Sequence, residues 1–170
     1  MALRGSLNNR LDENHYFNGT LNNIKVGDYA TIYYHTDRHA YEVIEVKDQS
    51  NIRIRRLNAI RTDNFGMSDA QNYRYESNEN GEKMSLRLTK GGWKEVSTYT
   101  KEGFERAVKR FRESAKTEEA AKSYIAYHWR LAGLTEKQVE KVMQGKEVIK
   151  VKGKVNISFG VADEYFDYCY

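Results

Sequence analysis

The chain has 170 residues, a formal net charge of +4 and 12% aromatic residues. A chain of this length is expected to form one domain, or a domain with an appended subdomain. It can bury a hydrophobic core without disulfides or a structural metal. Its single cysteine, Cys169, excludes an internal disulfide and a cysteine-based zinc site. Because we find neither the ~18 apolar residues of a transmembrane helix nor a signal peptide, we expect a protein of a reducing cytoplasm.

Short segments rich in β-branched and aromatic residues fill the first hundred residues. An Asn-Gly pair within residues 16–21 is typical of a tight hairpin. Residues 35–40 are predicted to form a turn between the first two of six further strands. These six strands are predicted over residues 25–34, 41–46, 51–56, 72–76, 83–90 and 93–98. Their number and spacing predict a small antiparallel β-barrel or a curled sheet.

The hydrophobic period changes to that of an α-helix at Lys101, where apolar residues recur every three or four positions. A second helix is predicted over residues 117–132, ended by Gly133. A capping box at Thr135 starts a third helix that runs to Gly145. The candidate buried positions of the second helix are Ala121, Tyr124, Ile125, His128 and Trp129.

Strand-like sequence returns after the helices. Residues 150–155 are predicted to form a hairpin, residues 155–161 alternate, and residues 165–170 form a last strand or an aromatic tail. The predicted fold is therefore α+β: a small antiparallel β-barrel or curled sheet, residues 1–100 and 147–170, with a three-helix insertion before the last strands. The insertion, residues 101–146, contains eleven Lys or Arg and seven Glu, which equals the whole net charge of +4.

Three stretches of the β parts carry a family resemblance: residues 6–10 (Ser-Leu-Asn-Asn-Arg), 36–40 (Thr-Asp-Arg-His-Ala) with 59–68 (Ala-Ile-Arg-Thr-Asp-Asn-Phe-Gly-Met-Ser), and 155–161 with 165–170. In these stretches the chain resembles a family of small uncharacterised proteins encoded by bacteriophages and prophages. The family has no established activity. The resemblance implies a context, namely an accessory protein of the bacterial host cytoplasm or a component of the virion.

Polar side chains cluster in the predicted turn at residues 35–40. His35, Asp37 and His39 would share one face if the segment were extended, as a metal site requires. His39 could also act in acid–base chemistry with Asp37 or Asp63 as its partner, and Arg38 could hold a phosphate. The alternative is a polar hairpin tip in which Asp37 accepts from turn amides and Arg38 is solvated. Because tips bend, we favour this alternative over a metal site.

Arginines recur on the strand that follows this turn. Arg53 and Arg55 flank Ile54 and lie on one strand face, with Arg56 and Arg61 nearby. Together with tyrosines that could stack on bases, they would suit a nucleic-acid-binding barrel. The tyrosines in question are Tyr33, Tyr41 and Tyr73. The alternative is an exposed face balanced by carboxylates on neighbouring strands, which we favour because the β part is electrically neutral. The carboxylates in question are Glu42, Glu45 and Glu76.

The first predicted helix has basic residues beside its apolar stripe. These residues, Arg106, Lys109, Arg110 and Arg112, could contact phosphates or an acidic protein surface, or simply form a solvated helical face. The turn before the third helix faintly resembles a helix-turn-helix. Glu136 and Glu140 make that third helix a poor DNA-recognition face.

We expect a non-enzymatic accessory protein that binds a host or defence-system macromolecule, for example an inhibitor of a CRISPR effector. The alternatives are a nucleic-acid-binding small barrel, and a small metal-dependent or acid–base hydrolase or nuclease. We expect no catalytic residues, metal, cofactor or membrane partner. The partner is expected to be a host or defence protein or nucleoprotein, with at most weak nucleic-acid binding. The candidate binding residues are Asp37, Arg38, His39, Arg53, Arg55, Arg61, Asp63, Arg106, Lys109 and Arg110.

Overall fold

The computed structural model describes residues 23–168, which divide into two compact units. The first unit contains residues 23–95 and 153–168, and the second, here called the helical unit, contains residues 96–152. Both boundaries fall inside strands, so the units are joined by two chain crossings. The predicted hairpin at residues 16–21 and the thiol of Cys169 lie outside the described residues.

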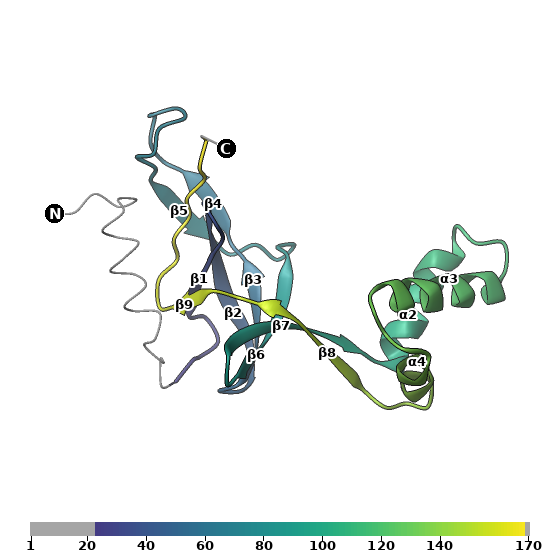
Figure 1. The fold of residues 1–170 in the computed structure, drawn as a ribbon. Coiled ribbons are helices and arrows are strands. Elements are labelled where there is room, and N and C mark those ends of the chain that lie inside the picture. Colours follow the sequence, from purple (N-terminus) through teal and green to yellow (C-terminus); the bar gives the residue numbers. More distant parts are fainter. Residues whose placement is uncertain (1–22, 169–170) are drawn as a thin grey trace. The chain divides into compact units, whose positions relative to one another are not determined.

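The fold is α+β, with a seven-stranded sheet, a separate two-stranded sheet and three helices in the described part of the chain (Figure 1). The large sheet has the order β8-β7-β6-β3-β2-β1-β9. Its pairs β1–β2, β1–β9, β2–β3 and β3–β6 are antiparallel. The strands are β1 (Tyr29–Tyr33), β2 (Arg38–Asp48), β3 (Asn51–Arg56), β6 (Lys83–Thr89), β7 (Gly92–Tyr99), β8 (Val148–Lys154) and β9 (Ile157–Phe159).

The two edge strands of this sheet, β8 and β9, are separated by only residues 155 and 156. The amide of Val155 donates to the carbonyl of Trp93 at 2.9 Å, next to the β7 edge. The carbonyl of Asn156 accepts from the amide of Tyr33 on β1, also at 2.9 Å. Neighbouring residues therefore bind strands near both edges, which requires a strongly curled sheet. A closed barrel is not found in the described part of the chain.

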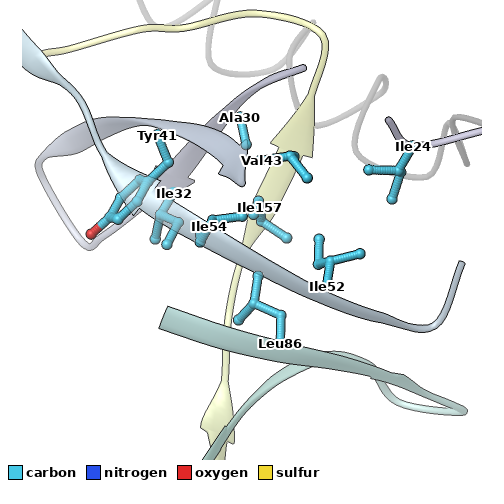
Figure 2. Packing of buried hydrophobic residues seen from close by; sticks show 9 residues of the cluster. All are labelled: Ile24, Ala30, Ile32, Tyr41, Val43, Ile52, Ile54, Leu86 and Ile157. Carbon is cyan, nitrogen blue, oxygen red and sulfur yellow. The ribbon is translucent and has the colours of Figure 1, made fainter. Parts of the chain in front are cut away.

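The core of the first unit forms on the inner face of the curled sheet (Figure 2). Along β3 the burial alternates: Ile52 and Ile54 are buried, whereas Arg53 is exposed. Successive side chains of a strand point to opposite faces, so every second residue of β3 faces the interior. The residues at these positions are β-branched, and such side chains pack well on a pleated surface. Each buried aliphatic side chain of this kind contributes about 1.5–3 kcal/mol. The cluster comprises Ile24, Ala30, Ile32, Tyr41, Val43, Ile52, Ile54, Leu86 and Ile157.

A second, two-stranded sheet is formed by β4 (Asn58–Arg61) and β5 (Tyr73–Glu76). Strand β4 was not among the predicted strands, because its four residues contain only one β-branched side chain, Ile60. The loop of residues 62–72 connects the two strands.

The helical unit contains α2 (Lys101–Arg112), α3 (Glu118–Leu131) and α4 (Glu136–Met143). A threonine caps the N-terminus of each helix by accepting from a backbone amide, and the capping box predicted at Thr135 is present. A small core of Phe104, Val108 and Ala121 joins α2 to α3, with the ring of Trp129 edge-on to Phe104 at 5.1 Å. The three predicted helices are confirmed to within a few residues.

The turn after α3 is fixed by glycine and by a lysine. Gly133 has φ +85°, a backbone conformation that other residues rarely adopt. Nζ of Lys150 on β8 donates to the carbonyl oxygen of Ala132 at 2.6 Å. This bond gives the last turn of α3 a cationic donor, which favours the partial negative charge of a helix C-terminus. A Cβ at position 133 would meet this Nζ at 2.0 Å.

Two local predictions were wrong, and one of two alternatives is excluded. Residues 150–155 do not form a hairpin, because β8 runs unbroken from Val148 to Lys154. Residues 165–168 form no strand, which leaves the alternative of an aromatic tail; among them only Tyr165 makes a β-bridge, to Arg38. The turn after β1 ends before Arg38, which already belongs to β2. A hydrogen bond from the Tyr34 amide to the Asp37 carbonyl, 2.8 Å long, closes that tight turn and leaves no room for a longer one.

Candidate functional site

The segment after β9, here called the strap (residues 160–168), passes over the strands that hold the predicted site. In Figure 1 it is the yellow trace that leaves β9 and passes beside β4 and β5. The amides of Arg38 and Tyr165 each donate to the other's carbonyl at 3.0 Å. The hydroxyl of Thr31 donates to the Val161 carbonyl at 2.8 Å and accepts from the Asp163 amide at 3.0 Å. The strap is thus fixed by its backbone to β1 and β2.

Arg38 is a buried residue, not a solvated one. It is 5% exposed, and its Nη1 lies 2.8 Å from Oδ2 of Asp163 on the strap. Its guanidinium also lies over the ring of Tyr165, 5.1 Å from the centroid. A buried arginine requires such a partner, because an unpaired charge out of water is costly. The interpretation of Arg38 as a solvated tip residue is therefore wrong.

A second arginine holds the next strap residue. Arg56 and Glu164 form a bidentate pair, in which Nη1 donates to Oε2 at 2.7 Å and Nη2 pairs with Oε1. The same Oε2 accepts from the amide of Ala40 at 2.9 Å. Burial lowers the pKa of Arg56, but its hydrogen bonds to the Glu164 carboxylate raise it above the ordinary value. Arg56, which was named beside the β3 arginines but not among the candidate binding residues, is thus permanently charged and tied to the strap.

The other members of the predicted turn also contact or neighbour the strap. Oδ1 of Asp37 accepts from the amide of Asp167 at 2.9 Å. His39 is half-buried with its ring 4.9 Å from that of Tyr34. Burial and the nearby charge of Arg56 lower the pKa of His39 below its usual value.

Arg61 and Asp63 fix the loop of residues 62–72 to the end of the strap. Nε of Arg61 donates to both carboxylate oxygens of Asp63 at 3.0 Å, and Nη1 donates to the hydroxyl of Tyr168 at 2.9 Å. Asp63 also accepts from the amides of Asn72, at 2.7 Å, and Phe65, at 3.0 Å. The bonds from Arg61 and then from Asn72 hold the pKa of Asp63 well below its usual range. These two residues therefore brace a loop.

The arginines of β3 face carboxylates on β2. Nε and Nη2 of Arg55 donate to Oε1 of Glu42 at 3.0 and 2.7 Å. Arg53 is exposed and lies opposite Glu45 in the strand register. Tyr41, which was expected to be available for base stacking, is 1% exposed. The geometry thus favours the balanced face over a nucleic-acid platform at this strand.

The basic residues of the helical unit have a different environment. Arg106, Lys109 and Arg110 are exposed on α2, and no ion pair is found for them among the described residues. Their neighbour Arg112 has Nη1 3.4 Å from Glu118 Oε2, with both side chains largely in water. The three cations are therefore accessible to a partner.

An exposed aromatic face lies on α3, formed by Tyr124, Tyr127, His128 and Leu131. Tyr127 and Leu131 are 54% and 64% exposed. Tyr124 stacks on Phe111 of α2, with centroids 3.9 Å apart and the rings nearly parallel, and His128 lies 4.1 Å from Tyr124. The prediction that Tyr124 and His128 are buried was wrong. The positions i, i+3, i+4 and i+7 from Tyr124 form a second stripe beside the buried one, a signal present in the sequence.

The predicted residues thus fall into two groups that lie in different units. Asp37, Arg38 and Arg61 contact the strap, and His39, Arg53, Arg55 and Asp63 lie in the same unit. Arg106, Lys109 and Arg110 belong to the helical unit. Among residues 23–168, no three His, Cys, Asp or Glu side chains come together in a way that could hold a metal ion. In the same part of the chain, no helix has the length and apolar character needed to cross a membrane.

Comparison of the chain with protein-family models, with curated proteins and with solved structures gives no match.

Proposed function

We propose that the protein is a non-enzymatic accessory protein of a bacteriophage that binds a host or defence-system protein, and that the helical unit makes the contact. The observation that carries this proposal is the aromatic face of α3, which is exposed in a unit where Arg106, Lys109 and Arg110 of α2 have no ion pair with any described residue. The resemblance of the β parts to phage-encoded proteins supports the context, and an inhibitor of a defence complex is the form of the role that we favour.

The aromatic face has the composition of a protein-binding hot spot. Tyrosine supplies a large contact area at a low cost in side-chain entropy and is enriched in such hot spots. Stacking of Tyr124 between Phe111 and His128 further restricts its ring before any partner binds. A preorganised face loses less entropy on binding.

The α2 cations indicate the charge of the partner. Exposed Arg106, Lys109 and Arg110 favour a surface with an excess of carboxylates, since complementary charge accelerates encounter and excludes like-charged proteins. The arginines of the first unit contribute less to such a field, because Glu42, Asp163 and Glu164 neutralise three of them within the chain.

The test uses capture of the partner from infected cells, identification by mass spectrometry, and titration of the purified pair. We expect the Tyr127→Ala, Leu131→Ala double variant to bind at least about tenfold more weakly, as hot-spot truncation does. Val151→Ala is the matched control, because Val151 is an exposed apolar residue of the same unit, 44% exposed on β8. Equal binding by the double variant and the control would refute the proposed surface.

Nucleic acid is the second candidate partner. The bonds of residues 155 and 156 to strands near both sheet edges support closure into the small barrel that this function would use, and the α2 cations could contact phosphates. We favour it less, because Tyr41 is buried and Arg55 is paired. We expect weak oligonucleotide binding that is lost near physiological salt. Submicromolar affinity at that salt would favour this second candidate instead.

An acid–base or metal-dependent hydrolase has the least support. Its candidate residues Asp37 and Arg38 are both occupied by the strap, at Asp167 and Asp163.

A further inference from the structure

The strap covers a surface with the chemistry of a peptide-binding site. We infer that this surface, here called the strap seat (Thr31, Arg38, Ala40 and Arg56), binds an extended acidic segment of a partner protein, and that the strap occupies it within the chain. The inference goes beyond the proposed function, since it concerns the first unit and does not depend on the helical unit.

Two guanidinium groups of the seat recognise two consecutive carboxylates. Arg38 pairs with Asp163 at 2.8 Å, and Arg56 holds both oxygens of Glu164. The amide of Ala40 gives Glu164 a third donor. Bidentate arginine together with a backbone amide is the arrangement by which proteins recognise carboxylates selectively, because charge and geometry must both match.

The seat also recognises the main chain of its occupant. Arg38 and Tyr165 exchange two backbone hydrogen bonds, as in an antiparallel ladder. The hydroxyl of Thr31 bonds to the carbonyl of Val161 and to the amide of Asp163. Such contacts select an extended conformation and not a sequence, as in peptides that add to a sheet.

The first unit also buries one side chain of the occupant, that of Tyr165. Tyr165 is 6% exposed, its ring lies against the guanidinium of Arg38, and its hydroxyl donates to Asp69 at 2.9 Å. The preferred occupant is therefore an extended segment with two carboxylates followed by a tyrosine. The strap itself presents this pattern as Asp163-Glu164-Tyr165.

The strap is held in a way that allows exchange. Its other large apolar side chains, Val161 and Phe166, are 57% and 47% exposed, and it forms one β-bridge instead of a ladder. Segments with few buried apolar contacts open locally at lower cost than the core does. Because the strap is part of the chain, its effective concentration is on the order of millimolar, so a separate segment gains access only when the strap opens. The strap is therefore an autoinhibitory occupant.

The test uses the full chain and a fluorescein-labelled synthetic peptide with the sequence of residues 160–168. In the Asp163→Asn, Glu164→Gln variant the strap loses the two carboxylates that pair with Arg38 and Arg56, while the seat keeps both arginines. We expect this variant to bind the peptide at least about tenfold more tightly than the unaltered chain does, measured by fluorescence anisotropy. A peptide with glutamine at the position of Glu164 should bind the variant at least about tenfold more weakly.

Adding Arg56→Gln to the variant provides the matched control, because it removes the bidentate partner and should abolish binding. If the double variant does not fold by circular dichroism, Tyr165→Ala opens the strap by removing its buried ring and should raise peptide binding in the same direction. No gain of binding in a folded variant, or equal binding by the Arg56→Gln control, would overturn the inference.

A second copy of the chain is another possible occupant, and sedimentation of the unaltered chain tests it. A dimer whose formation depends on Glu164 would show that straps exchange between copies, and it would replace the partner segment as the occupant. The assay contains no partner of the helical unit. A negative result in the peptide assay would therefore not contradict the proposed function. Conversely, a negative result for partner binding by the aromatic face of α3 would not change the peptide result.

Discussion

The two units use arginine in opposite ways. In the first unit, Arg38, Arg55 and Arg56 each pair with a carboxylate of the same chain, and Arg38 is 5% exposed. In the helical unit, Arg106 and Arg110 extend into water without a described ion partner, and Arg112 and Arg130 form only 3.4 Å pairs between exposed side chains. Buried or half-buried arginines thus stabilise the fold in the first unit, whereas the arginines of the helical unit remain accessible, so the role of an arginine follows from its neighbours.

Burial follows the same division. The nine residues of the first-unit cluster come from five strands and from the segment before β1. The cluster of the helical unit has three buried residues on α2 and α3, and Val96, Leu134, Val142 and Val148 are buried outside it. Stability is expected to be unequal in consequence, since the area removed from water determines most of the favourable free energy. The helical unit should be the less stable part.

The largest expected effect is that of Phe104→Ala. Phe104 is 3% exposed at the centre of the helical core, so its truncation should cost about 3–5 kcal/mol and unfold the helical unit. Amide hydrogen exchange should then show loss of protection in residues 101–143 and retained protection in β1 to β3. Loss of protection in both units would show that they fold as one cooperative body.

The corresponding truncation in the first unit, Ile54→Ala, is the control for that comparison. Ile54 is fully buried in the first-unit cluster, and its truncation should cost about 2–5 kcal/mol. The loss of exchange protection should then begin in the strands and not in the helices.

Arg38→Ala is expected to have the next largest effect. Removing this arginine leaves Asp163 without its 2.8 Å partner and removes the cation that covers Tyr165, so we expect a loss of about 3 kcal/mol. Chemical denaturation followed by tryptophan fluorescence measures it. Exposed Arg53→Ala is the matched control, expected to change stability by about 0.5 kcal/mol or less. Similar values for the two variants would contradict the burial of Arg38.

The helical unit was predicted from sequence because its signals are local. Capping threonines and the three-to-four-residue period at Phe104 and Val108 act within one helix. Strands β1, β2, β3, β6 and β7 of the large sheet were predicted for the same reason, since alternation along β3 needs only its own residues. Strand β8 was not, because its sequence was interpreted as a hairpin.

The strap seat could not be predicted, because its contacts join residues more than a hundred positions apart. Arg56 and Glu164 are separated by 108 residues, and no period or spacing relates them. Asp37 and Arg38 were named as candidate binding residues from the turn alone, but nothing in the sequence indicated their partners on the strap. The aromatic face was missed for another reason: its second stripe on α3 was assigned to the core.

Asp63 gives a smaller, pH-dependent effect. Its pKa lies well below the usual range, mainly because of hydrogen bonds from Arg61 and from the Asn72 amide. Since the folded state favours the charged carboxylate, this stabilisation is complete above the unfolded pKa of about 3.9 and is lost as the pH falls through the folded value. Asp63→Asn should therefore be less stable than the unaltered chain at neutral pH. The difference should narrow below about pH 4. Denaturation curves of the two proteins, measured at several pH values, give this difference in stability. A difference that stays constant from neutral pH to below about pH 4 would contradict the pairing of Asp63 with Arg61.

The smallest expected effect on stability is that of the Arg106→Ala, Lys109→Ala, Arg110→Ala triple variant. Each side chain is exposed and none has a described ion pair, so each substitution should change stability by about 0.5 kcal/mol or less. Alanine even favours the helix slightly. The variant should nevertheless bind the captured partner with a slower association rate and a weaker dependence on salt, because those cations create the steering field. Lys137→Ala on α4, also exposed, is the control for a single lost charge. If the triple variant lost stability as well as binding, these cations would be holding α2 in place. The two units would then differ in how much apolar surface they bury and not in how they use arginine.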